Sequence, residues 1–192
     1  MFIEPAIQSD GRGWIEVICG SMFSGKTEEL IRRLRRAQIA NLRVGIFKPR
    51  VDDRYHSENI VSHDENTILS IPVIHAKQIL DQASTVDVVG IDEAQFFDES
   101  LLEICDTLAL KGTRVIVAGL DMDYLGKPFG PMPLLLSRAE YITKLHAICT
   151  QCGNIANYSY RKAGNTEQLL IGNKDYYEPR CRRCYEKGDL LK

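Results

Sequence analysis

The segment Gly20–Thr27, which reads GSMFSGKT, constrains the fold of this 192-residue chain more than any other feature. It matches the pattern G-x-x-x-x-G-K-[ST] at every fixed position, with an apolar strand predicted at 14–19 and a helix predicted at about 27–40. In such a strand–turn–helix unit, backbone N–H groups and the positive end of the helix dipole face phosphate oxygens. The sequence therefore predicts a phosphate-binding turn, where Lys26 reaches the β- and γ-phosphates of a nucleotide and Thr27 holds Mg²⁺.

Further apolar runs predict the rest of a nucleotide-binding fold. Buried strands are expected at 44–47, 86–91 and 115–118, and a helix is expected where Leu101, Leu102, Cys105 and Leu108 recur, with Gly112 as its stop. The polar stretch 52–66 lacks periodicity and predicts a loop. Strands that alternate with helices indicate an α/β fold of the P-loop NTPase type, in which helices flank a parallel sheet.

The character of the chain changes near residue 145, where polar residues and paired cysteines replace the long apolar runs. We therefore expect a P-loop nucleotide-binding domain at 1–146 and a small C-terminal zinc-binding domain at 147–192.

Two adjacent carboxylates, Asp92 and Glu93, follow the predicted strand 86–91. In a parallel sheet this end of the strand faces the phosphate turn. An Asp at this place holds Mg²⁺ in P-loop enzymes, directly or through water. Glu93 is expected to point to the other side and is the candidate to orient an acceptor and take its proton. An ATPase could use the same Glu to position water, so the pattern alone does not identify the acceptor.

Four cysteines form two C-x-x-C pairs, Cys149 with Cys152 and Cys181 with Cys184. Four thiolates suit tetrahedral Zn²⁺ and leave no open position for chemistry, so we expect a structural zinc ion. The 28 residues between the pairs exceed the usual spacing and predict an intervening loop. Disulfides are the competing interpretation, which a reducing compartment disfavours. Cys19 and Cys105 fall on apolar patterns and are expected to be buried thiols.

Composition excludes some partners. The net charge is -2, from 24 basic and 26 acidic residues, which argues against bulk binding to nucleic acid or to an anionic membrane. The absence of a long apolar run and of a signal peptide leads us to expect a cytoplasmic protein. Arg32, Arg33, Arg35 and Arg36 form a basic cluster on the first predicted helix, which we interpret as a solvated face or a subunit contact.

In combination these motifs resemble the type II (cellular-type) thymidine kinases, over nearly the whole length from Trp14 to Cys184. The residues that carry the resemblance are the phosphate turn, the two cysteine pairs and four short motifs: DDRY at 52–55, DEAQFF at 92–97, GLD at 119–121 and KPFG at 127–130. Met22 and Phe23 inside the phosphate turn are unusual among P-loops in general. The set as a whole is highly specific.

The resemblance implies that Glu93 is the catalytic carboxylate beside the 5′-hydroxyl of the substrate. It implies that ATP and Mg²⁺ are bound by Gly20, Ser21, Met22, Phe23, Ser24, Gly25, Lys26, Thr27, Asp92 and Gln95. It implies a thymine pocket lined by Met22, Phe96, Leu120 and Tyr124, the last of which is often Phe in related enzymes. A lasso, the segment 153–180 between the cysteine pairs, is implied to close over the nucleoside with Ser159, Ile171, Gly172 and Tyr177. Asp52 and Arg54 are implied to help order the acceptor end.

The implied function is transfer of the γ-phosphate of ATP to the 5′-hydroxyl of thymidine, which gives dTMP for DNA synthesis by salvage. Structural zinc, a homotetramer and feedback inhibition by dTTP are implied as well. Two alternatives stay open: another nucleoside specificity, such as deoxyuridine, and a P-loop ATPase whose zinc-ribbon module binds nucleic acid. Arg182 and Arg183 are, with the helical arginines, the best support for the ATPase. The intact Lys26, Thr27, Asp92 and Glu93 argue against a regulatory protein without turnover.

Overall fold

The computed structural model describes residues 11, 13–50, 59–61, 67–162 and 176–189 of the chain. In chain order its elements are β1 (Trp14–Gly20), α1 (Lys26–Ile39), β2 (Val44–Pro49), β3 (Asn59–Val61), β4 (Thr67–Leu69), β5 (Ile71–Val73), α2 (Lys77–Gln82), β6 (Val88–Ile91), the 3-10 helix η1 (Ala94–Phe96), α3 (Ser100–Leu110), β7 (Arg114–Gly119), α4 (Met132–Arg138), β8 (Tyr141–Leu145), β9 (Ala147–Ile148), β10 (Ile155–Ala156), β11 (Tyr158–Arg161), β12 (Tyr177–Arg180) and α5 (Arg182–Asp189).

Six strands form the central sheet in the order β5-β2-β6-β7-β1-β8, and every neighbouring pair is parallel. The four strands predicted from apolar runs lie at its centre as β1, β2, β6 and β7. The predicted helix with its stop at Gly112 is α3, which ends at Leu110 and is followed by Gly112 with a φ of 88°. The parallel α/β fold expected from the sequence is therefore confirmed.

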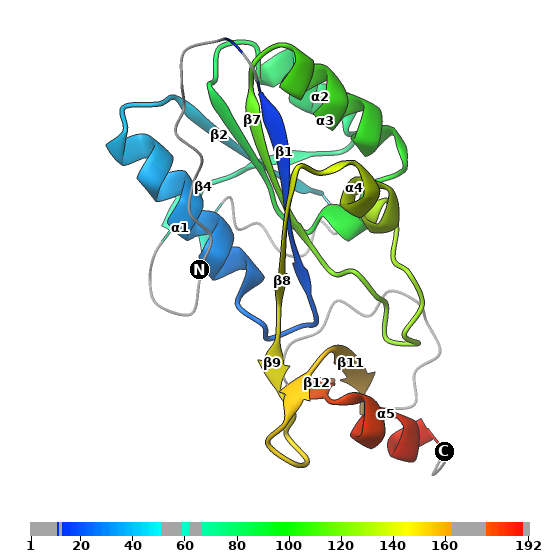
Figure 1. Ribbon diagram of the computed structural model, residues 1–192. Helices are drawn as coiled ribbons and strands as arrows, with labels where there is room; N and C mark the ends of the chain where they lie inside the picture. The colour runs from blue at the N-terminus through cyan, green and yellow to red at the C-terminus, as the bar shows by residue number, and fades with distance from the viewer. Residues whose placement is uncertain (1–10, 12, 51–58, 62–66, 163–175, 190–192) are drawn as a thin grey trace.

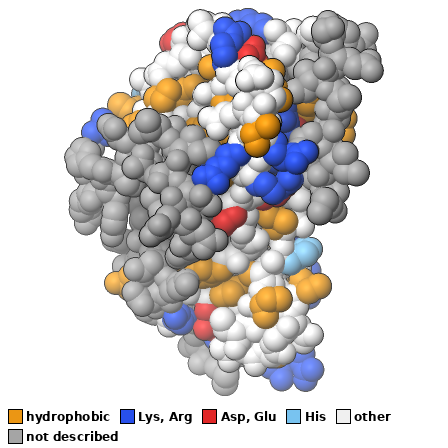
Figure 2. Space-filling view, turned by 90° about the vertical axis from the view of Figure 1, so that its left-hand side faces the viewer, with side chains coloured by type: hydrophobic (Ala, Val, Ile, Leu, Met, Phe, Trp, Pro, Cys, Tyr) orange, Lys and Arg blue, Asp and Glu red, His pale blue; other side chains and the backbone are white. Residues whose placement is uncertain are grey.

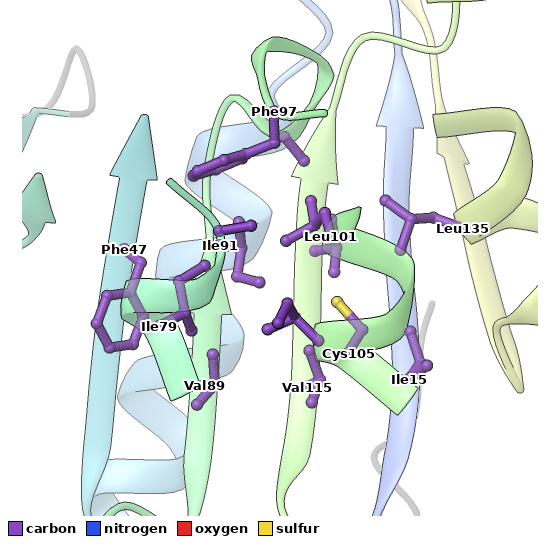
Figure 3. Packing of buried hydrophobic residues seen from close by; sticks show 14 of the residues in the cluster. Ile15, Phe47, Ile79, Val89, Ile91, Phe97, Leu101, Cys105, Val115 and Leu135 are labelled. Atoms are coloured by element: carbon purple, nitrogen blue, oxygen red, sulfur yellow. The ribbon is translucent and has the colours of Figure 1, made fainter. Parts of the chain in front are cut away.

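Helices cover both faces of the sheet (Figure 1). On one face α1 packs its predicted stripe of Leu30, Ile31, Leu34 and Ala37 against the strands, and all four side chains are buried. On the other face α2, α3 and α4 enclose a larger core (Figure 3), in which Leu101 and Cys105 of α3 lie over the sheet. Cys19 and Cys105 are both buried in this core, as expected. Removal of this apolar surface from water is the main force that holds the layers together.

Two expectations about individual segments are wrong. Asn59–Val61, inside the stretch predicted as a loop, pairs with Thr67–Leu69 as an antiparallel ladder. Short strands of this kind carry too few residues for a periodic signal. The basic cluster on α1 is not uniformly solvated, because Arg33 has no exposed surface whereas Arg36 is exposed. Arg33 lies three residues after Leu30, on the buried face of the helix.

The face of the molecule on which α1 lies carries charges of both signs. Figure 2 turns the left side of Figure 1, where α1 lies, toward the viewer, and shows Lys and Arg side chains beside Asp and Glu. Arg32 on α1, for example, donates to Glu29 with an N–O distance of 2.6 Å. The described part of this face is therefore mixed in charge.

Arg33 belongs to a buried network of charged groups centred on Glu16 of β1. The Glu16 carboxylate accepts hydrogen bonds from Arg33 Nη1 at 2.8 Å and from Arg114 Nε at 2.6 Å. Trp14 Nε1 donates to the same carboxylate at 2.7 Å, and Arg33 Nε also donates to Glu29 at 2.8 Å. The two buried guanidinium groups, those of Arg33 and Arg114, thus share the Glu16 carboxylate, and Glu29 pairs with Arg33 as well as with Arg32. The network connects α1 to β1, which leads into the phosphate turn, and to the neighbouring strand β7.

The C-terminal elements form a small group beyond the carboxyl ends of β1 and β8 (Figure 1). It consists of two antiparallel hairpins, β9 with β10 and β11 with β12, followed by α5. Tyr185 of α5 stacks on Tyr158 of β11 at a centroid distance of 4.5 Å. In the described ranges, no helix combines the length and the apolar composition needed to cross a bilayer.

Candidate active site

The phosphate turn joins β1 to α1 in the strand–turn–helix order that the motif predicts. Phe23 and Gly25 have positive φ angles of 65° and 85°, which bend the backbone into a concave turn just before α1 begins at Lys26. Successive backbone N–H groups in such a turn form an anion-binding hollow. Lys26 Nζ donates to the Ser21 carbonyl oxygen at 2.8 Å, which keeps the ammonium group over the turn. Burial lowers the pKa of Lys26, although the nearby carboxylates counteract this effect.

The acidic pair after β6 meets the phosphate turn. Thr27 Oγ1 donates to Asp92 Oδ2 at 3.2 Å, although 65 residues separate them in the chain. Asp92 is buried, and this burial, reinforced by the charge of Glu93, raises the pKa of Asp92 to about 7. A hydroxyl oxygen beside a carboxylate oxygen is a donor set that suits a hard cation, whose charge would favour the ionised carboxylate. These two residues therefore fit the predicted magnesium site.

Glu93 is placed by its backbone conformation and not by strand alternation. β6 ends at Ile91, and Glu93 adopts a left-handed φ of 52°, which is unfavourable for a residue with a side chain. Its side chain is exposed, and its carboxylate Oε2 accepts a hydrogen bond from Gln95 Nε2 at 2.5 Å. Strain of this kind is found where a functional group must be presented in one direction. The geometry presents an oriented carboxylate beside the phosphate turn.

Gln95 fixes the direction of the Glu93 carboxylate. Its amide is buried, donates to Glu93 and accepts a hydrogen bond at Oε1 from the Leu120 backbone N–H at 2.9 Å. Because the Leu120 N–H can only donate, the Gln95 amide oxygen must face Leu120, and the Gln95 amide nitrogen must then face Glu93. The contact with phosphate implied for Gln95 stays a prediction. The described contacts assign it to Glu93, a role that sequence reasoning missed.

Gly130→Ala should disturb this arrangement. Gly130 has a φ of 50°, and a Cβ there would overlap the backbone oxygen of Gln95. We expect a loss of about 2–3 kcal/mol in unfolding free energy from strain and overlap together, and a lower kcat because Gln95 moves. Chemical denaturation and steady-state kinetics measure the two effects. Gly153→Ala is the matched control, since Gly153 has a φ of 73° and nothing within 4 Å of a built Cβ. Equal effects of the two changes would contradict a specific role for the Gln95 contact.

The residues implied for the thymine pocket come from three parts of the chain. The Met22 backbone N–H in the phosphate turn donates to Ser159 Oγ of β11 at 3.0 Å. Phe96 packs edge-on against Phe129 at a centroid distance of 5.6 Å. Tyr124 and Tyr177 both contact the guanidinium group of Arg161, and Leu120 is joined to Gln95. Ile171, Gly172, Asp52 and Arg54 lie outside the described residues.

Arg161 is a further site residue that sequence reasoning missed. It is buried in β11, two residues after Ser159. The only signal in the sequence is an arginine that ends the alternating run Tyr158–Arg161, which a solvated strand end would explain equally well.

The four paired cysteines converge as their spacing predicts. The Sγ atoms of Cys149, Cys152, Cys181 and Cys184 all lie within 4.8 Å of one another. Cys149 and Cys152 flank a turn closed by a hydrogen bond from the Gly153 N–H to the Cys149 carbonyl at 2.9 Å. β9 ends just before the first cysteine pair, and β10, β11 and β12 lie in the long gap between the pairs. Four thiol sulfurs at one point are a donor set that fits tetrahedral Zn²⁺.

Comparison with known proteins adds to this geometry. The sequence model of the family described as thymidine kinase matches residues 13–185. A thymidine kinase of Rhodothermus sp. (strain ITI 518) is 60% identical over 188 residues, which cover 97% of this chain and 88% of that protein. A thymidine kinase of Bacteroides fragilis (strain YCH46) is 55% identical over 189 residues, which cover 98% and 95%. Among solved structures, the flagellar accessory protein FlaH from Methanocaldococcus jannaschii matches with a TM-score of 0.51 and 12% identity over 77% of this chain and 76% of that one, which shows a shared fold alone.

Proposed function

The chain belongs to the thymidine kinase family, and we propose that it transfers the γ-phosphoryl group of ATP to the 5′-hydroxyl of thymidine, giving ADP and dTMP. One observation carries this proposal. The phosphate turn and the acidic pair after β6 form a single hydrogen-bonded group, through Thr27 and Asp92, in a chain with near full-length similarity to thymidine kinases. The phosphate donor would lie in the turn, and the acceptor would lie on the side of Glu93.

The residues of the site divide the work of phosphoryl transfer. The backbone N–H groups of the turn and the start of α1 would hold the phosphates, and the Lys26 ammonium would offset charge on the transferring group. Thr27 and Asp92 would hold Mg²⁺, which when bound neutralises charge on the β- and γ-phosphate oxygens. Glu93 would accept the proton of the 5′-hydroxyl, with its carboxylate oriented by Gln95. The nucleoside would lie between two segments, the loop that follows β7 and the strand β11, where Tyr124 and Tyr177 supply aromatic surface.

The molecule that accepts the γ-phosphoryl group of ATP distinguishes the proposed function from its alternatives. Labelled ATP is supplied to the native protein with thymidine, deoxyuridine, deoxycytidine, single-stranded DNA or water as the sole acceptor. We expect labelled dTMP with thymidine and little free phosphate with DNA or water. Free phosphate that rises with DNA in the absence of dTMP would instead support the ATPase alternative. A higher kcat/KM for deoxyuridine than for thymidine would revise the substrate and leave the reaction class unchanged.

The proposal includes the properties that the family resemblance implies beyond the site. They are a homotetramer and feedback inhibition by dTTP. Two expectations from the composition of the chain belong to the proposal as well: a division into a kinase domain at 1–146 and a zinc and lasso domain at 147–192, and a cytoplasmic location. Light scattering tests the tetramer, and inhibition kinetics with dTTP test the feedback.

Cys152→Ser should remove the proposed zinc ion. We expect about one zinc per chain in the native protein and less than about one-tenth of that in the variant, because a three-thiolate site binds the metal far more weakly. The loss should cost about 2–3 kcal/mol of folding free energy, which lowers Tm by roughly 5–10 °C. Metal analysis and calorimetry measure both. Cys105→Ala is the control, because this buried thiol lies in the core and should leave the zinc content unchanged. Native stability in a zinc-free Cys152→Ser protein would contradict a structural role.

A further inference from the structure

Arg161 lies where the C-terminal hairpins meet the phosphate turn. Ser159 of the same strand accepts a hydrogen bond from the Met22 backbone N–H, so β11 runs beside the turn. Because side chains alternate along a strand, Arg161 lies on the same side of β11 as Ser159. The intervening Tyr160 faces the other way, toward Tyr185 of α5 at a centroid distance of 6.1 Å. Arg161 is 3% exposed, so its guanidinium group lies inside the protein and faces the site.

The guanidinium group of Arg161 joins two aromatic rings. Its Cζ lies 3.6 Å from the ring centroid of Tyr124, which is van der Waals stacking distance. Its Nε and Nη2 both donate to the Tyr177 hydroxyl, at 3.1 and 2.5 Å. Tyr124 belongs to the loop after β7 and Tyr177 begins β12, so the three residues come from different segments. One planar cation therefore sets where both rings lie.

The backbone of this loop is held separately from the ring. The Tyr185 hydroxyl of α5 donates to the Tyr124 carbonyl oxygen at 2.7 Å. Because the backbone is held at this point, the Tyr124 ring can move only by rotation about its side-chain torsions. The stack on Arg161 limits this rotation. A guanidinium group suits this task because it is planar, always charged and able to stack while donating in its own plane.

We propose that Arg161 is a positioning residue for the nucleoside, which holds the rings of Tyr124 and Tyr177 in the orientation that admits the base. The inference rests on the proposed function, in which these two tyrosines line the base pocket. Arg161 makes no step of phosphoryl transfer, so its effect falls on nucleoside binding and not on the chemistry at Glu93 or on ATP.

Arg161→Met tests the proposal, because it should change the KM for thymidine and leave kcat and the KM for ATP nearly unchanged. We expect the KM for thymidine to rise roughly 10- to 30-fold, the size of a buried cation–π contact. The kcat should stay within about 3-fold and the KM for ATP within about 2-fold, as for the loss of a ground-state binding contact. Arg161→Lys keeps the charge and loses the planar fork, so it should resemble Arg161→Met. Full recovery by lysine would overturn the proposal, because charge alone would then suffice.

Arg180→Met is the matched control. Arg180 lies in the same group of hairpins and stacks on Tyr160 at 3.4 Å, but its contacts are with Glu178 and the Cys184 carbonyl and not with the implied pocket. We expect its thymidine KM within about 2-fold of native. Equal rises in thymidine KM for Arg161→Met and Arg180→Met, or a rise accompanied by zinc loss, would show a general loosening and overturn the proposal. An unchanged thymidine KM in Arg161→Met would do so as well. If the native protein makes no dTMP, it is the proposed function that fails.

Discussion

A Glu93→Gln protein should phosphorylate thymidine about 100- to 10,000-fold more slowly than the native protein at saturating substrates, the range typical for loss of a general base. Glutamine has the same shape and can turn its amide oxygen toward the Gln95 amide nitrogen, so the hydrogen bond at this place survives. What is lost is the negative charge and the ability to take the proton of the 5′-hydroxyl. The change therefore removes chemistry with little change in structure.

Single-turnover and steady-state transfer of labelled phosphate measure the effect, with the KM values for ATP and thymidine expected within a few-fold of native. Glu103→Gln on α3 is the control, because it makes the same chemical change at an exposed side chain. The buried residues of this helix, Leu101 and Cys105, are left as they are. The control should leave kcat unchanged. A fall in kcat of less than about 10-fold for Glu93→Gln would mean that Glu93 does not act as the base.

The second large effect concerns stability. Glu16→Gln should lower the unfolding free energy by about 3–5 kcal/mol, because it leaves Arg33 and Arg114 buried without the carboxylate that both contact. A domain has only about 5–15 kcal/mol of stability in total, so this single change brings the protein close to unfolding. The entry to the phosphate turn would be affected too, because β1 leads directly into it.

Urea titration followed by circular dichroism measures the loss, and Trp14, the one tryptophan of the chain, reports on the network by its fluorescence because it donates to Glu16. Asp87→Asn is the control, since it breaks a similar arginine–carboxylate pair with Arg43 at the surface and should change stability little. A triple change, Glu16→Leu with Arg33→Met and Arg114→Met, should recover much of the loss, because an apolar replacement leaves no charge uncompensated. If Glu16→Gln unfolds with native stability, the network does not hold α1 to the sheet.

Local sequence patterns predicted most of the central strands and two of the helices of this chain. The strands β1, β6 and β7 and the helices α1 and α3 were predicted within a few residues of their bounds, because apolar periodicity and the phosphate turn are signals contained in one segment. The meeting of Thr27 with Asp92 followed from the rule that parallel strands present their carboxyl ends at one edge. The convergence of the four cysteines followed from their pairing.

The missed features have a common cause. β8 is an edge strand of five residues with mostly exposed side chains, and α4 has seven residues, so neither gives a long periodic pattern. The local rule predicts a solvated face or a subunit contact for Arg33, because it treats the four arginines on the helix alike. Its burial depends on Glu16, which is 17 residues away, and on the strand that carries it.

The sequence by itself determined the type of fold and the use of a Mg-nucleotide, through the phosphate turn and the acidic pair, and its motifs over nearly the whole chain pointed to the thymidine kinases. Only the tertiary structure decided how Glu93 is held by Gln95, how Arg114 reaches Glu16 across 98 residues, and how Arg161 joins Tyr124 to Tyr177. The reason is physical. Strand and helix formation depend on neighbours in the chain, whereas a buried charge or amide is tolerated only where partners from distant segments satisfy it.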